Sequence, residues 1–133
     1  MAIIGFITLS ITAKPLFSNS KESKLSSLSI EKYKACIAAC NECIKSCNNC
    51  ESMCTKGKDA KMTTCIQLCK DCISSCKTAI KAMNDNSTTV KKDCTECAKV
   101  CEKCATECDK FANDHCKKCA TDCRKAAKLC NEM

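Results

Sequence analysis

The sequence has very few aromatic residues, glycines, prolines and histidines. Its 133 residues include one tyrosine, three phenylalanines and no tryptophan, which argues against an aromatic core, a base-stacking surface or a large substrate pocket. The single histidine excludes a haem array and repeated Cys/His zinc fingers. With only two glycines and one proline, a loop-rich disulfide knot and most β architectures are excluded as well.

The positive charge is spread along the chain rather than gathered in a block. The formal net charge is +7, and most of it comes from lysines that lie between cysteines. The chain has no dense arginine patch and no aromatic residues interleaved with basic ones, so we expect no nucleic-acid partner. The lysines are typical of a solvated helix surface.

Residues 1–28 hold no cysteine and differ from the rest of the chain. The uncharged apolar stretch 2–11 is too short to span a membrane, but it suits the apolar region of a secretory signal with cleavage near Ala13 or Ser20. No basic residue precedes Lys14, so the basic start of such a signal is missing. We predict a signal-like or disordered segment, favour an exported or periplasmic location over a cytoplasmic one, and expect no stable membrane insertion of the mature domain.

Cysteine dominates the remaining sequence, and its content alone sets the protein apart from ordinary globular domains. Because Leu, Ile, Val and Phe are scarce, any core must be made largely of sulfur. The cysteines form four groups in which steps of three and four residues alternate, apart from one step of seven at the end. This is the spacing of the inward positions of bundled helices, and it places each group on one stripe. The groups are Cys36, Cys40, Cys43, Cys47, Cys50 and Cys54; Cys65, Cys69, Cys72 and Cys76; Cys94, Cys97, Cys101, Cys104 and Cys108; and Cys116, Cys119, Cys123 and Cys130.

Short segments rich in turn and capping residues separate the groups. Gly57 is expected to cap the end of one helix and Asp59 the start of the next, while 84–87 and 109–114 supply the other two connections. The pattern predicts helices over 29–56, 60–84, 88–110 and 114–131. Because short connections make consecutive helices antiparallel neighbours, we predict an all-α fold, an antiparallel up-down-up-down four-helix bundle with a cysteine-lined core over residues 29–133.

Three uses of so many thiols without copper are weaker interpretations. Cysteine packs as a small hydrophobe, but packing alone gives no reason for it at nearly every inward position. Disulfides would leave one thiol unpaired and could form only between helices, since thiols along one stripe are badly oriented for bonding. Iron–sulfur clusters have a partial match in the Cys36, Cys40 and Cys43 spacing, but the ferredoxin pattern with its trailing proline is absent.

Monovalent copper suits helical cysteine stripes better than zinc does. Zinc prefers closed sites with four ligands, and one continuous stripe offers no discrete sets of four. Cu(I) is soft, prefers thiolate and accepts two or three ligands, and one thiolate cancels the charge of one ion. An iron–sulfur electron-transfer protein and a broad soft-metal sink for silver, zinc or mercury remain the alternatives.

The stripes, together with Glu-Cys-Asp-Lys-Phe at 107–111 and Asp-His-Cys-Lys-Lys-Cys-Ala at 114–120, resemble the bacterial copper storage proteins over about residues 30–133. The resemblance implies a four-helix bundle whose cysteines store many Cu(I) ions, with access from one end. Ala126 and Ala127 stand where a further cysteine would continue the last stripe, which interrupts the expected metal string there.

We therefore expect a non-catalytic Cu(I) storage or buffering protein in which all nineteen cysteines are ligands. No set of residues supports catalysis: His115 has no second histidine beside it, and no glycine-rich phosphate loop occurs. The expected partners are copper ions and a copper chaperone or a copper-requiring enzyme.

The two ends of the predicted bundle differ. Met53, Met62 and His115 fall at one end near the inward stripe, where thioether and imidazole would act as weaker, exchangeable Cu(I) ligands. The alternative is that the methionines fill gaps in the core and His115 lies at the surface. The other end collects apolar residues that we expect to form a plug: Ile30, Tyr33, Ile80, Met83, Val90 and Leu129.

Overall fold

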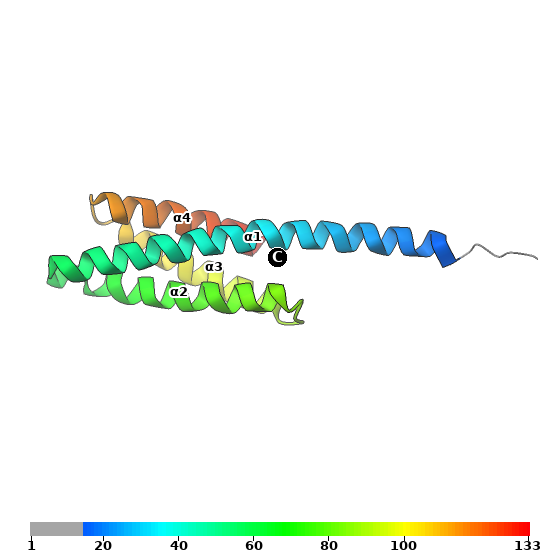
Figure 1. The fold of residues 1–133 in the computed structure, drawn as a ribbon. Helices are drawn as coiled ribbons and strands as arrows, with labels where there is room; N and C mark the ends of the chain where they lie inside the picture. Colours follow the sequence, from blue (N-terminus) through cyan, green and yellow to red (C-terminus); the bar gives the residue numbers. More distant parts are fainter. Residues whose placement is uncertain (1–14) are drawn as a thin grey trace, which may run out of the picture. The chain divides into compact units, whose positions relative to one another are not determined.

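The computed structural model describes the backbone of residues 15–133 and the side chains of residues 30–133. Its elements are α1 (Pro15–Gly57), the 3-10 turn η1 (Ala60–Met62), α2 (Thr63–Asn84), α3 (Val90–Cys108) and α4 (Asp114–Asn131) (Figure 1). Residues 15–133 contain no strand. The chain divides into two units, Met1–Ile30 and Glu31–Met133.

In the first unit, α1 begins at Pro15, well before the start predicted at residue 29. Proline suits the first position of a helix because its missing N–H would have no partner there. Lysine, glutamate and leucine in the segment that follows are good helix formers. The apolar stretch 2–11 lies outside the described residues, so the signal-like or disordered character of residues 1–28 stays a prediction.

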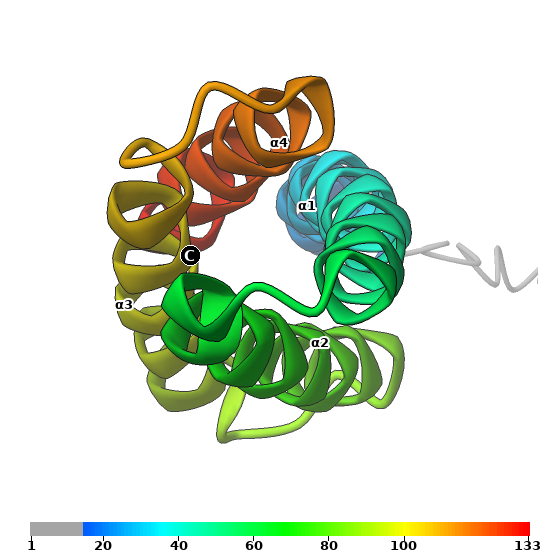
Figure 2. The ribbon, with the colours of Figure 1, turned by 90° about the vertical axis from the view of Figure 1, so that its left-hand side faces the viewer.

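The second unit is the predicted antiparallel four-helix bundle. Residues 31–57 of α1 lie between α2 and α4, and α3 closes the ring on the opposite side (Figure 2). Sulfur contacts agree with this order, because the Sγ atom of Cys43 on α1 lies 3.5 Å from that of Cys72 on α2 and 3.5 Å from that of Cys123 on α4. The predicted fold class is confirmed.

The first connection differs from its prediction in one detail. Gly57 is the last residue of α1 and its φ is not positive, whereas Lys58 takes the left-handed conformation with φ 50°. Asp59 acts as the predicted cap, since its Oδ1 accepts a hydrogen bond from the Lys61 N–H at 2.9 Å. The chain then makes one 3-10 turn before α2 begins at Thr63, three residues later than predicted.

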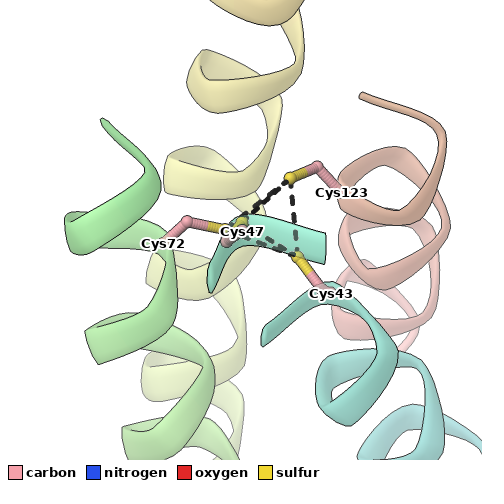
Figure 3. A group of neighbouring side chains, drawn as sticks. All are labelled: Cys43, Cys47, Cys72 and Cys123. Carbon is pink, nitrogen blue, oxygen red and sulfur yellow. Dashed lines mark hydrogen bonds between the residues drawn. The ribbon is translucent and has the colours of Figure 1, made fainter. Parts of the chain in front are cut away.

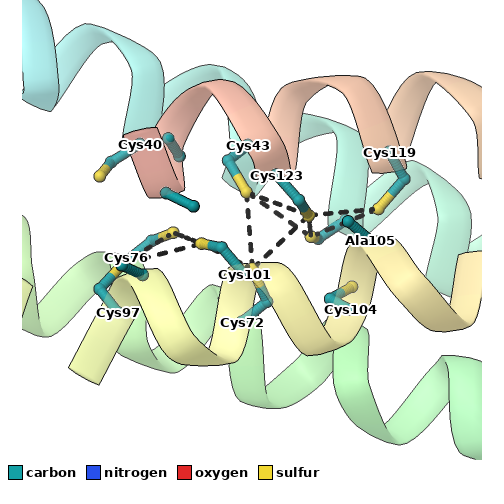
Figure 4. Close-up of a cluster of buried hydrophobic side chains, with 14 of the residues drawn as sticks. Cys40, Cys43, Cys72, Cys76, Cys97, Cys101, Cys104, Ala105, Cys119 and Cys123 are labelled. Atoms are coloured by element: carbon teal, nitrogen blue, oxygen red, sulfur yellow. Dashed lines mark hydrogen bonds between the residues drawn. The ribbon is translucent and has the colours of Figure 1, made fainter. Parts of the chain in front are cut away.

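The core consists of cysteine and alanine with a few larger side chains. All nineteen cysteines are buried, and Ala79, Ala105, Ala126 and Ala127 are fully buried among them. Small side chains fill little volume, so a tightly packed interior requires closely spaced helices. Figure 4 shows part of this interior, with sulfur atoms from several helices pointing toward one another.

Polar side chains tie the helices together at the bundle surface. The Ser46 hydroxyl on α1 donates to Asp122 on α4, which also pairs with Lys118 at 3.0 Å. The Arg124 guanidinium binds Asp109 beyond the end of α3. Exposed ion pairs of this kind contribute little to stability, so the buried core holds the helices together.

None of the described helices is long and apolar enough to cross a membrane.

Candidate metal centre

Every predicted cysteine ligand lies inside the bundle as a free thiol. None of the nineteen is more than 3% exposed, and none forms a disulfide. Alternating steps of three and four residues place the cysteines of each stripe on one face of their helix. That face packs against the other helices, so it points toward the bundle axis. The four stripes therefore share one interior.

Four sulfur atoms near the middle of the bundle form a compact group, which we call the central group. It consists of Cys43 and Cys47 from α1, Cys72 from α2 and Cys123 from α4 (Figure 3). The Sγ atom of Cys123 lies 3.5 Å from that of Cys43, 3.7 Å from that of Cys47 and 3.8 Å from that of Cys72. The ligands of the central group come from three helices, so the sequence argument, which considered one stripe at a time, did not identify it.

Further groups of four lie along the bundle, and each shares at least one sulfur with a neighbouring group. Within each group the ligand atoms all lie within 4.8 Å of one another. Because the groups share sulfurs, thiols follow one another without a break through the middle of the core (Figure 4). Such a path offers many two- and three-sulfur sites side by side. Three of these groups are Cys43, Cys72, Cys76 and Cys101; Cys47, Cys104, Cys119 and Cys123; and Cys50, Cys69, Cys108 and Cys119.

At the far end of the bundle, the predicted gap in the cysteine stripe of α4 is present. Cysteines of α1 contact the last cysteine of α4 beyond this gap. Ala126 and Ala127 are fully buried and carry no ligand atom. The Sγ atom of Cys130 nevertheless lies 3.4 Å from that of Cys36 and 3.7 Å from that of Cys40. Thiols therefore continue to meet beyond the alanines, with α1 supplying the neighbours.

The electrostatics of the core favour a mixture of protonated and ionised thiols. Burial raises the pKa of Cys116 to about 12. Hydrogen bonding with Cys108 is the main cause that lowers the pKa of Cys104 to about 6, and hydrogen bonding with Cys101 does the same for Cys97. A thiolate is stabilised by neighbours that still carry protons, so the thiols cannot all ionise together unless cations enter.

Two of the three predicted entrance ligands lie beside the outermost thiols. Met62 is buried, and its Sδ atom accepts a hydrogen bond from the Cys54 thiol at 3.7 Å. His115 is half-buried, with Nδ1 3.5 Å from the Sγ atom of Cys116. His115 joins Cys50, Cys54 and Cys116 in a group whose ligand atoms lie within 4.8 Å of one another.

Met53 is placed differently from the other two. Its side chain is 46% exposed, and it belongs to the wall of a pocket of about 330 Å³ at this end of the bundle. Met62 and His115 line the same pocket, together with Phe111, which sequence reasoning did not single out. Phe111 entered the sequence analysis only within the segment 107–111, because only the fold brings this connection to the pocket.

The opposite end is closed mainly by two of the residues predicted to form a plug. Met83 and Val90 are buried, and Tyr33, Ile80 and Leu129 are partly buried against the core. Ile30, the sixth of these residues, is 51% exposed.

Comparison with known proteins agrees with this arrangement. The family model described as copper storage protein matches residues 29–133. The Cu(I)-bound copper storage protein BsCsp3 is 40% identical, with a TM-score of 0.74, over 77% of this chain and 97% of that one. The apo form of copper storage protein 3 from Bacillus subtilis is also 40% identical, with a TM-score of 0.70, over 74% and 95% of the two chains.

A cytosolic copper storage protein from Streptomyces lividans, described with five coppers, is 26% identical with a TM-score of 0.75. The similarity covers 80% of this chain and 94% of that one. No curated protein matches the chain. The match of the family model over most of the sequence, with 40% identity to solved relatives, shows that the chain belongs to the copper storage protein family.

Proposed function

We propose that this protein stores or buffers Cu(I), with the nineteen buried cysteines as ligands. The observation that carries the proposal is the run of overlapping sulfur groups inside a closed bundle. A metal–sulfur bond of about 2.3 Å gives a sulfur–sulfur distance of about 4.0 Å in a three-coordinate site. The sulfur contacts of 3.4 to 4.0 Å in this core lie close to that value.

Charge balance sets the expected capacity. Each Cu(I) ion that replaces a thiol proton leaves a neutral pair, so the buried core fills without accumulating charge. We expect about one ion per thiol, on the order of twenty when full. Anaerobic titration of the reduced apo-protein with Cu(I), followed by native mass spectrometry, measures this number. Binding that stops at one to four ions under reducing conditions would contradict storage.

The alternative of an iron–sulfur electron-transfer protein is tested by colour. Filled Cu(I)–thiolate cores are colourless, whereas iron–sulfur clusters absorb visible light. Protein purified anaerobically from iron-replete cells should show no visible absorption. A broad soft-metal role is addressed by competition between Cu(I), silver and zinc for the same thiols.

We also propose that copper enters and leaves beside Met62 and His115. Both side chains contact the outermost thiols, and both line the pocket at that end. Thioether and imidazole bind Cu(I) less strongly than thiolate does, which suits transfer rather than retention. A copper chaperone or a copper-requiring enzyme would dock at this end, and the protein would carry out no catalysis of its own.

Export remains a proposal supported only by the apolar stretch at residues 2–11. The relative from Streptomyces lividans is described as cytosolic, so that similarity gives no support to an exported form. Cell fractionation together with the intact mass of the isolated protein tests it. A full-length mass in the cytoplasmic fraction would contradict export.

A further inference from the structure

The central group has the dimensions of a tetrahedral four-thiolate site. Four sulfurs that each lie about 2.3 Å from a zinc ion are about 3.8 Å apart from one another. In the central group the distances from Cys43 to Cys47, Cys72 and Cys123 are 4.0, 3.5 and 3.5 Å. Cys123 lies 3.7 and 3.8 Å from Cys47 and Cys72, and the remaining pair is within 4.8 Å.

We propose that Cys43, Cys47, Cys72 and Cys123 bind one divalent ion of the zinc and cadmium class when copper is scarce. Ions of this class have no electronic preference among geometries and settle in closed four-coordinate sulfur sites. All four sulfurs are fully buried and come from three helices, so the site is closed on every side. Five of its six sulfur pairs make hydrogen-bond contacts at 4.0 Å or less, against three pairs in each of the two groups that share two of its sulfurs, which is why it is the preferred position.

Neighbouring thiols can offset the charge of the bound ion. A divalent ion with four thiolates carries a net charge of −2, which is costly in a buried core unless hydrogen-bond donors surround it. The Cys101 sulfur lies 3.5 Å from that of Cys72, and the Cys119 sulfur lies 3.6 Å from that of Cys47. As thiols, both can donate S–H bonds to the site.

The same donors make the site sensitive to copper. Cu(I) ions bound at Cys101 and Cys119 compete for Cys72 and Cys47, whose sulfurs lie 3.5 and 3.6 Å away, so the divalent complex is destabilised. Entry of the divalent ion displaces the protons that these four sulfurs of the central group still carry. Its replacement by four Cu(I) ions changes the charge of the site from −2 to zero and releases one divalent ion, with no oxidation or reduction. Copper loading is thereby coupled to release of the resident ion.

Cadmium is the probe for a first test on the reduced, metal-free protein under anaerobic conditions. We expect one Cd²⁺ per chain that survives gel filtration, with thiolate-to-cadmium charge-transfer absorption and a ¹¹³Cd resonance typical of four thiolate ligands. The variant C43A/C123A should raise the Kd for this ion by at least about 100-fold, above the range found for loss of an outer-shell partner.

The matched control is C36A/C130A, which also removes two buried sulfur contacts between α1 and α4. The two pairs are alike, with sulfur–sulfur distances of 3.4 Å for Cys36 and Cys130 and 3.5 Å for Cys43 and Cys123. The control should retain the ion. Circular dichroism of both variants, and of C43S/C123S with nearly unchanged side-chain volume, verifies folding. Failure of the unmodified protein to retain cadmium, or equal loss in both variants, would overturn the proposal.

A second test measures displacement and separates this inference from the storage proposal. Zn²⁺-loaded protein is titrated with Cu(I) in the presence of a chromophoric zinc indicator. Release of the zinc before copper loading is complete supports the coupling, and retention to full loading overturns it. A protein that retains cadmium but binds no more than a few Cu(I) ions would overturn storage while leaving the four-thiolate site standing.

Discussion

The thiol of Cys54, the last cysteine of α1, donates a hydrogen bond to the thioether of Met62 at 3.7 Å. Met62 closes the 3-10 turn that follows the first connection, so this contact joins the end of one helix to the start of the next. Cys54 also belongs to the group of possible metal ligands that contains Cys50, His115 and Cys116. The contact therefore marks a point where a weaker ligand reaches the outermost thiol.

Joint replacement of Met53, Met62 and His115 by alanine should slow copper loading and removal while leaving capacity almost intact. We expect rates to fall by about 10-fold or more, the scale seen when a supporting ligand-shell group is lost. Met62 and His115 should account for most of the effect, because Met53 is largely exposed. Stopped-flow loading with a Cu(I) donor measures the rates.

The control for this experiment opens the other end of the bundle. Tyr33→Ala and Val90→Ala remove side chains that cover the far end of the core. Unchanged rates in this control are expected. Rates that change here, and not in the Met53, Met62 and His115 variant, would show that copper enters from the far end.

The reduced apo-protein should be folded and helical without metal. Alanine, lysine and glutamate between the stripes favour helix, and the four helices bury one another's inward faces. Circular dichroism after copper removal with a strong chelator should therefore match that of the loaded protein closely. A coil spectrum for the reduced apo-protein would mean that metal drives folding.

Copper binding should weaken as pH falls. Burial raises the pKa of Cys116 to about 12, so this thiol is protonated at neutral pH and must lose a proton to bind Cu(I). Each proton displaced lowers the apparent affinity about tenfold per unit fall in pH. Thiols with a lowered pKa, such as Cys104 at about 6, should release less than one proton at pH values above that.

Proton release measured in weakly buffered solution tests this prediction. The number of protons per Cu(I) should be below one at about pH 8 and should rise toward one as pH falls, because more thiols then start protonated. A metal-free buffer titration is the control. Half-saturation that does not move with pH would contradict the prediction.

Replacing Lys58 by glycine should stabilise the apo-protein. Lys58 has a φ of 50°, a conformation that costs a residue with a Cβ atom about 1 kcal/mol and costs glycine almost nothing. Lys45→Gly is the matched control: the same substitution at an exposed position in the interior of α1 should destabilise by about 1 kcal/mol. Urea unfolding of the reduced proteins measures the change in unfolding free energy for both variants. Destabilisation by Lys58→Gly would contradict the left-handed conformation of Lys58.

The helices and their buried faces were predictable from the sequence because both depend on local periodicity. Steps of three and four residues repeat with the turn of a helix, so each group of cysteines specifies its own inward stripe without reference to any other helix. The same local rule placed Met62 near the inward stripe at one end of the bundle, and Met62 is buried at that end of the core. Asp59 was likewise found as a cap from its position after Gly57.

Only the tertiary structure decided which sulfurs of different helices meet. Cys36 and Cys130 are 94 residues apart in the chain, yet their sulfurs lie 3.4 Å apart. Their meeting depends on how far each helix is shifted along the bundle and how the helices cross, and neither quantity is encoded in the spacing of a single stripe. The central group was missed for this reason, because its ligands come from three helices. The left-handed conformation of Lys58 beside an unstrained Gly57 was decided in the same way, by how the connection must turn to bring α2 against α1.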